Sequence, residues 1–141
     1  MAPDPPARTW SRKMSDIPSD LIYTEEHEYL KPTDEAGVYL VGITDYAQGE
    51  LGDVVFIELP ETGASFNGME IFGTIEAVKA VSDLYCPVQG EIVDINASLD
   101  DDPSLVNSDP YGEGWMIKLR LANEGDLDGL LTSDAYADHV G

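Results

Sequence analysis

Basic residues and cysteine are scarce in this chain. Its 141 residues include 7 Lys and Arg against 28 Asp and Glu, which gives a formal net charge of −21. This charge argues against nucleic acid or an anionic membrane as a partner, because either surface would repel the chain. The single cysteine excludes an internal disulfide and fits a reducing compartment. No apolar run approaches the roughly 20 residues of a membrane helix, so the sequence predicts no membrane span.

Catalytic groups are scarce as well. The chain has two histidines and shows no nucleophile beside an orienting base, no phosphate-binding glycine loop and no cluster at metal-ligand spacing. His27 stands among three glutamates, but neighbouring residues of a strand point to opposite faces and cannot converge on one ion. We therefore expect neither an enzyme nor a metal site. Cys86 is interpreted as a small, partly buried hydrophobic residue near a turn.

Length and composition indicate one small domain. The chain is 43% hydrophobic, enough for a single core. Residues 1–13 differ from the rest, with three prolines and three basic residues but no apolar core of a secretory signal. We expect residues 1–16 to be a disordered extension and residues 17–141 to be a single domain. The prolines and Asp4 oppose the amphipathic helix of a mitochondrial presequence, so a bacterial cytoplasmic location is favoured.

The residue pattern is mainly that of β-structure. Thr44 and Gly52 mark the start and end of a short helix over residues 45–51. Asp102 and Pro103 are predicted to open another helix before Asn107. Residues 126–139 place leucines near helical spacing, which predicts a C-terminal helix. The expected strands are residues 21–24, 28–31, 38–43, 54–59, 71–78, 81–86, 91–96 and 115–121.

Two segments of the chain are echoed later in the sequence. Residues 52–57 and 90–95 share a glycine followed by an acidic residue and a β-prone run. Residues 68–72 and 114–118 share a glycine that leads into a strand-like run. The sequence therefore predicts a quasi-duplicated β domain.

Lys79 lies between the two halves. From Met14 onward the only basic residues are Lys31, Lys79, Lys118 and Arg120. The runs 70–78 and 81–86 are β-prone, and a tight turn between them would place Lys79 at a hairpin tip that an enzyme can reach. Pro87 and Gly90 predict a second reversal, with Gly90 free to take a positive φ. We interpret Lys79 as a lysine displayed for modification, against the plain alternative of a solvated hairpin lysine.

Four blocks of the chain carry a resemblance to a known family: residues 23–30, 42–48 with 51–60, 76–90, and 105–112 with 114–117. They resemble the H protein family of the glycine cleavage system. The likeness runs from about Ile17 to the C-terminus, although this family usually has tryptophan where Tyr29 stands and serine or alanine where Cys86 stands. It implies a mainly β fold, the barrel-sandwich hybrid of the lipoyl and biotinyl carriers, with short peripheral helices and a C-terminal helix.

The resemblance implies a carrier rather than a catalyst. Lys79 would hold lipoic acid through an amide bond, a long tether that raises the local concentration of the reactive sulfurs at each partner. Loss of the lysine charge would let the arm lie on apolar surface. Glu28 and Asp83 would line that surface and pair with an amine cargo, the plain alternative being two solvated acids.

The implied partners are the enzymes that use the arm in turn. These are the pyridoxal phosphate-dependent glycine decarboxylase, the tetrahydrofolate-dependent aminomethyltransferase and the FAD-dependent dihydrolipoyl dehydrogenase, together with the lipoylating enzymes. The high negative charge favours steering toward basic rims on them. A monomer is expected, because one arm must reach several active sites.

Three other functions fit parts of the pattern. A biotin carrier usually brackets its lysine with methionines, whereas Val78 and Ala80 stand here. A lipoyl domain of a 2-oxoacid dehydrogenase is expected to continue through a linker into an acyltransferase, and no such continuation follows Gly141. A relative of the H protein that only donates or relays lipoyl groups to other lipoyl-dependent complexes would look the same in sequence.

Overall fold

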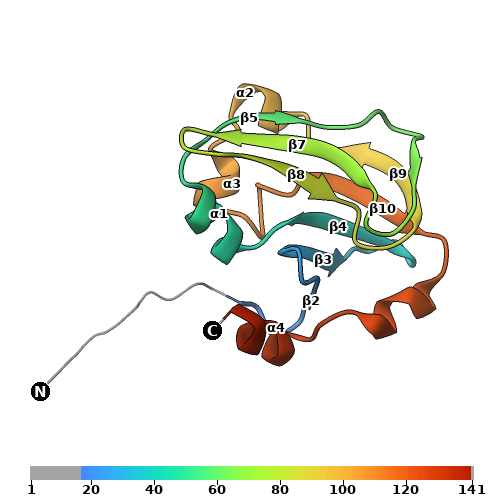
Figure 1. Cartoon of the computed structure of the whole chain (residues 1–141). Helices are drawn as coiled ribbons and strands as arrows, with labels where there is room; N and C mark the ends of the chain where they lie inside the picture. Colours follow the sequence, from blue (N-terminus) through green and yellow to red (C-terminus); the bar gives the residue numbers. More distant parts are fainter. Residues whose placement is uncertain (1–16, 141) are drawn as a thin grey trace, which may run out of the picture.

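Two antiparallel β-sheets form the body of the protein. The structure is a computed structural model that describes residues 17–140. One sheet has six strands in the order β2-β3-β4-β10-β9-β6, and the other has three in the order β5-β7-β8. Figure 1 shows the three-stranded sheet stacked on the larger one. The strands are β2 (Ile22–Tyr23), β3 (Glu28–Pro32), β4 (Val38–Ile43), β5 (Val54–Glu58), β6 (Ser65–Phe66), β7 (Ile71–Ala77), β8 (Val81–Tyr85), β9 (Gly90–Ile95) and β10 (Ile117–Leu121).

Short helices surround the sheets. They are α1 (Asp45–Leu51), α2 (Ser98–Asp101), α3 (Leu105–Ser108), the 3₁₀ helix η1 (Glu124–Gly129) and α4 (Ser133–Val140). The predicted mainly β fold with peripheral helices and a C-terminal helix is therefore confirmed. Within residues 17–140 no helix has the length and apolar character needed to cross a bilayer. The predicted extension, residues 1–16, lies outside the described residues.

The main core lies between the two sheets. Ile57 on β5 is buried between exposed neighbours, because successive strand residues point to opposite faces. Burial of such side chains is the main stabilising term, at about 25 cal/mol for each Å² of apolar surface. The core includes Leu30, Val41, Ile57, Phe72, Ile75, Leu84, Ile92, Val106, Met116, Ile117 and Leu119.

A second, smaller core lies on the other face of the six-stranded sheet, between that sheet and α4 (Figure 1). The rings of Tyr23 and Tyr136 are stacked with centroids 4.8 Å apart. The Tyr29 hydroxyl donates a hydrogen bond to the carbonyl oxygen of Pro110 at 2.5 Å. The Tyr29 ring covers Gly42 on the neighbouring strand, where an added Cβ would come within 2.8 Å of its hydroxyl oxygen. A glycine is therefore required at that position.

The two sequence echoes become corresponding strand pairs. Strand β5 pairs with β7 in the small sheet, and β9 pairs with β10 in the large sheet, both antiparallel. This placement in opposite sheets agrees with the predicted quasi-duplication.

All eight predicted strands are present, with shifted ends, while β6 and α2 were missed. Helix α1 is confirmed together with its caps, because the Thr44 hydroxyl accepts a hydrogen bond from the Ala47 amide and Gly52 ends the helix. The helix predicted before Asn107 begins at Leu105 and includes that residue.

Two local predictions are wrong. The single helix over residues 126–139 is split into η1 and α4, because Leu131 between them exchanges two backbone hydrogen bonds with Tyr23. Gly90 does not have a positive φ. It lies in β9, where an added Cβ would come within 2.5 Å of the Arg120 carbonyl oxygen. Close approach of two strands, rather than turn geometry, requires this glycine.

Candidate functional site

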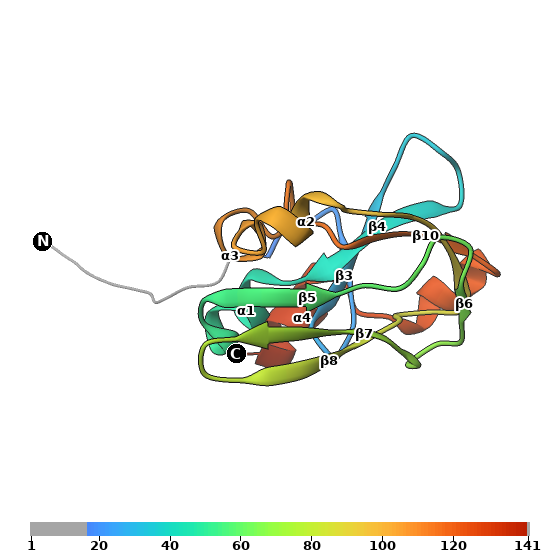
Figure 2. The same ribbon diagram turned by 90° about the horizontal axis from the view of Figure 1, so that it is seen from above.

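Lys79 lies in the turn between β7 and β8, as predicted. Ala77 and Ala80 exchange backbone hydrogen bonds of 2.7 and 3.4 Å, which leaves Val78 and Lys79 as the central residues of a tight turn. Neither has a positive φ, so the turn is not one of the primed types that match strand twist. The Val78 amide donates to the carbonyl oxygen of Asp53 at 3.0 Å. This bond attaches the tip to the loop after α1, at the end of the sheet seen in Figure 2.

The Lys79 side chain is exposed and passes over Gly52. A Cβ on Gly52 would come within 2.8 Å of the Lys79 Cε atom. Gly52 has φ 82° and ψ −158°, a region essentially restricted to glycine. Within residues 17–140, Lys79 makes no hydrogen bond or ion pair. Its amino group therefore remains available to a partner.

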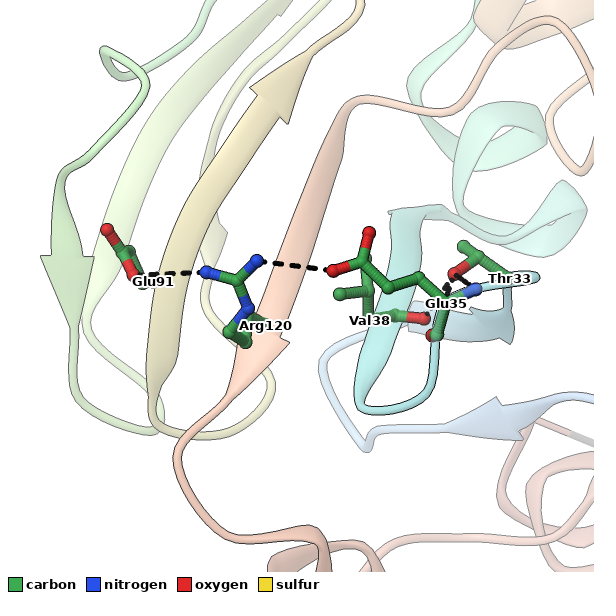
Figure 3. Close-up of polar contacts among 5 residues, drawn as sticks. All are labelled: Thr33, Glu35, Val38, Glu91 and Arg120. Atoms are coloured by element: carbon green, nitrogen blue, oxygen red, sulfur yellow. Dashed lines mark hydrogen bonds and ion pairs between the residues drawn. The ribbon is translucent and has the colours of Figure 1, made fainter.

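The other three basic residues of that part of the chain are engaged. Lys31 donates to the carbonyl oxygen of Tyr111 at 3.0 Å, and the Lys118 amino group lies 5.8 Å from the centre of the Trp115 ring. Arg120 lies 3.2 Å from Glu35 and 3.7 Å from Glu91 (Figure 3). These three side chains belong to the six-stranded sheet.

Asn107 of α3 holds the loop that supports the lysine turn. Its amide nitrogen donates to the Gln48 side chain and to the Gly52 carbonyl oxygen, both at 2.9 Å, and its amide oxygen accepts from the Val54 amide at 2.9 Å. One side chain thus links α1, the loop and β5. Sequence reasoning placed Asn107 near a helix but gave it no such role.

A cavity of about 260 Å³ lies beside the hairpin, lined by residues of both sheets and of α1. Asp83 is three residues after Ala80, which ends the turn. At 3.3 Å per residue, the Cα atoms of these two residues are about 10 Å apart. The cavity has apolar lining, two rings and acidic groups. Its lining residues are Ile43, Ala47, Leu51, Ile75 and Leu84; His27 and Tyr46; Glu26, Glu28, Glu50 and Asp83; and Ser82.

The two carboxylates singled out from the sequence, Glu28 and Asp83, line this same cavity but differ in burial. Asp83 is exposed and shares the outer face of β8 with Val81, two residues earlier, whereas Glu28 is only 2% exposed. Glu28 accepts hydrogen bonds from the Thr24 hydroxyl at 2.7 Å and from the Tyr85 amide at 3.4 Å. Burial raises the pKa of Glu28 to about 8. Because Tyr85 is on edge strand β8, Glu28 also connects the two sheets.

His27 and Tyr46 were not expected to line the cavity. His27 is a turn residue with φ 72°. The sequence interpretation that excluded a metal site had treated it as a strand residue. Its Nδ1 lies 2.8 Å from the Tyr136 hydroxyl, which lies 2.7 Å from the Thr44 hydroxyl. Burial, and then the nearby His139, lowers the pKa of His27. Within residues 17–140 no three His, Cys, Asp or Glu side chains gather as metal ligands.

Cys86 is completely buried, and its Sγ lies 3.1 Å from the Val88 carbonyl oxygen. Burial raises the pKa of Cys86 to about 12. The thiol is therefore not in a reactive setting, which agrees with the interpretation of Cys86 as a small hydrophobic residue, although it is completely rather than partly buried.

A two-sheet β fold that presents an exposed lysine, unpaired within the described residues, on a hairpin turn has the arrangement of a lipoyl or biotinyl carrier domain. Residues 21–141 match the family model described as glycine cleavage H-protein. The chain belongs to the glycine cleavage H-protein family, and the resemblance seen in the sequence is confirmed.

Individual relatives agree. The chain is 54% identical over 127 residues to the glycine cleavage system H protein of Marinobacter nauticus, which covers 90% of this chain and 97% of the relative. It is 56% identical to that of Rubrobacter xylanophilus, covering 88% and 94%. The crystal structure of a glycine cleavage system H protein from Mycobacterium marinum superposes with a TM-score of 0.80 at 40% identity, covering 89% of this chain and 99% of that one.

Proposed function

We propose that Lys79 bears lipoate in amide linkage and that the chain serves as the lipoyl carrier of a glycine cleavage system. Family membership supports the carrier role. The assignment to Lys79 depends on one observation: within residues 17–140 it is the basic side chain that is exposed at a turn and makes no hydrogen bond or ion pair. Bound lipoate would supply a dithiolane that takes up an aminomethyl group and is later reoxidised.

The cavity fits a neutral arm with a cationic end. Conversion of Lys79 to an amide removes its charge, so the arm can lie on the apolar residues that line the cavity. Glu28 is mostly protonated near neutral pH, since its pKa is raised to about 8. An ammonium group arriving beside it would favour the ionised carboxylate and pair with it. Asp83 borders the cavity from edge strand β8, but its row with Thr74 and Glu58 places its side chain on the outer face, so Glu28 is the acid that would hold the cargo inside the cavity.

The remaining parts of the role follow from this assignment. The chain acts as a non-catalytic shuttle between glycine decarboxylase, aminomethyltransferase and dihydrolipoyl dehydrogenase, after lipoylating enzymes have loaded Lys79. It works as a monomer in the bacterial cytoplasm. The relatives described above are bacterial, which supports the location.

Mass spectrometry of the protein from a lipoate-supplied host tests the assignment. A lipoyl increment confined to the Lys79 peptide, and missing from Lys79→Ala, is expected. Reconstitution of glycine cleavage with the three partner enzymes then separates the carrier from a protein that only relays lipoyl groups. An unmodified Lys79 under conditions that lipoylate a control domain would reject the proposal.

The cavity assignment has its own test. A Glu28→Gln protein loaded with the aminomethyl group should release ammonia and formaldehyde faster than the parent, and Asp83→Asn tests whether the outward-facing acid contributes as well. Glu91→Gln removes one charge from β9, away from the cavity, and is the matched control. Equal release rates for a cavity variant and the parent would remove that residue from the protective role.

A further inference from the structure

Exposed apolar side chains form a row beside Lys79 on the outer face of the small sheet. Phe56 on β5 is paired with Glu76 on β7, which is paired with Val81 on β8. Phe56 is 51% exposed and Val81 is 69% exposed. Val55 next to Phe56 and Val78 in the turn extend the row, at 53% and 74% exposed. Such residues in isolation are ordinary, but four of them grouped around Glu76 at the end of the sheet that carries Lys79 indicate an interaction surface.

Acidic residues accompany this group, which we call the tip surface (Val55, Phe56, Val78 and Val81). Glu76 lies within the row, and the next outward-facing row along the sheet pairs Glu58 with Thr74 and Thr74 with Asp83. Strands β5, β7 and β8 contain no basic residue. Charge complementarity therefore calls for a partner with an apolar centre and a basic rim.

The short reach of unmodified Lys79 distinguishes the enzyme that modifies it from the enzymes that use the finished arm. Amide formation requires the neutral Nζ to attack the carbonyl carbon of an activated lipoyl group. The new C–N bond forms as the bond to the leaving group breaks, and the nitrogen loses a proton to a base. Before this step Lys79 has only its own four methylene groups, so the active site that modifies it must come into contact with the turn. Enzymes that use the finished arm can meet it further from the protein surface.

We propose that the tip surface is the docking site of the enzyme that attaches lipoate to Lys79. This inference rests on the proposed function of Lys79. Phe56 provides the largest apolar side chain of the surface, and its burial in the complex fixes the hairpin while Lys79 enters the active site. The surrounding carboxylates meet basic residues of the enzyme, which raises the association rate at low salt.

Lipoylation kinetics of the full chain test the inference. Unmodified parent, Phe56→Ser, Val81→Thr and Ile71→Ser are offered to a purified lipoate ligase with ATP and lipoate. Phe56→Ser should raise KM about tenfold with kcat little changed, because apolar contact is lost while the lysine is intact. Ile71→Ser is the matched control: Ile71 is 47% exposed on β7 but about 17 Å from Glu76 along the strand. Its KM should stay within about twofold of the parent.

Each outcome of these kinetic measurements either supports or overturns the proposed docking site. A KM effect for Phe56→Ser and Val81→Thr but not for Ile71→Ser supports the docking site, and Val81→Thr keeps the test open if Phe56→Ser fails to fold. Normal KM in folded variants overturns it, as does an equal effect of Ile71→Ser. Normal loading followed by slow glycine cleavage would assign the surface to another partner and also overturn it. A parent that is not lipoylated at all would instead reject the function proposed for Lys79.

Discussion

Buried Glu28 should make the stability of this protein fall as the pH rises through neutrality. Its ordinary pKa of 4.5 is raised to about 8 in the folded state, because the carboxyl group is desolvated in the cavity. The folded chain therefore keeps a proton over a pH range in which the unfolded chain has lost it. This contribution to stability is complete below pH about 4.5 and is lost as the pH rises through about 8.

The magnitude follows from the interval between the two pKa values. Each pH unit within it lowers the free energy of unfolding by about 1.4 kcal/mol, so the whole interval is worth about 5 kcal/mol. Small domains are stable by about 5–15 kcal/mol, so the effect is measurable. Glu28→Gln removes the titrating proton, and its amide oxygen can still accept a hydrogen bond from Tyr85.

Urea unfolding of the parent and Glu28→Gln at several pH values between about 5 and 8 measures this effect. Subtracting the two curves cancels the acids they share. The parent should lose about 1.4 kcal/mol per pH unit relative to the variant. Glu91→Gln controls for the removal of an acidic side chain on the surface. Parallel curves for the parent and Glu28→Gln would refute the reasoning, because they would mean that Glu28 ionises alike in the folded and unfolded states.

Three further substitutions, with Gly49→Ala as a comparison for Gly52→Ala, test the supports of the site. Asn107→Ala should lower the free energy of unfolding by about 2–3 kcal/mol in urea titrations, because the Val54 amide and the Gly52 carbonyl oxygen lose this partner; an unchanged midpoint would contradict this. Gly52→Ala should cost about 1–3 kcal/mol through backbone strain, whereas Gly49→Ala in open space on α1 should stabilise by about 0.5–1 kcal/mol. Tyr136→Phe keeps the ring stack but should lower stability by about 1–2 kcal/mol through two lost hydroxyl contacts, which thermal unfolding can detect.

Sequence reasoning succeeded where the determinants of structure are local. The cap and stop of α1 are Thr44 and Gly52, which adjoin the helix in the chain, so both could be read directly. The β7–β8 turn is likewise set by neighbouring residues. The C-terminal tail failed for the opposite reason. Leu131 leaves the helical path to bridge Tyr23, which is more than a hundred residues earlier in the chain. Strand β6 has two residues and depends on its pairing with β9, so its sequence gave little local signal.

The candidate site divides in the same way. Lys79 could be singled out from the sequence because basic residues are rare in this chain and because the two β-prone runs on either side predict a turn at this position. Glu28 and Asp83 came from family resemblance, and their shared cavity depends on how the two sheets pack. The roles of Asn107 and His27 were not visible, because Asn107 meets Val54 53 residues away and His27 meets Tyr136 109 residues away. No local pattern records contacts of that range.

A carrier needs a fixed turn and a free lysine side chain, and different parts of the hairpin meet these two needs. The base of the turn must be fixed so that partners meet one surface, and it is held from outside by the bond from Val78 to Asp53 and by Asn107 beneath that loop. The side chain of Lys79 must remain free, and it makes no polar contact within the described residues. A shuttle must also leave each partner. Long-range attraction between a net charge of −21 and the basic rim of a partner speeds encounter more than it strengthens the complex, whereas a tip surface of only four apolar side chains would limit how tightly the lipoylating enzyme holds the chain.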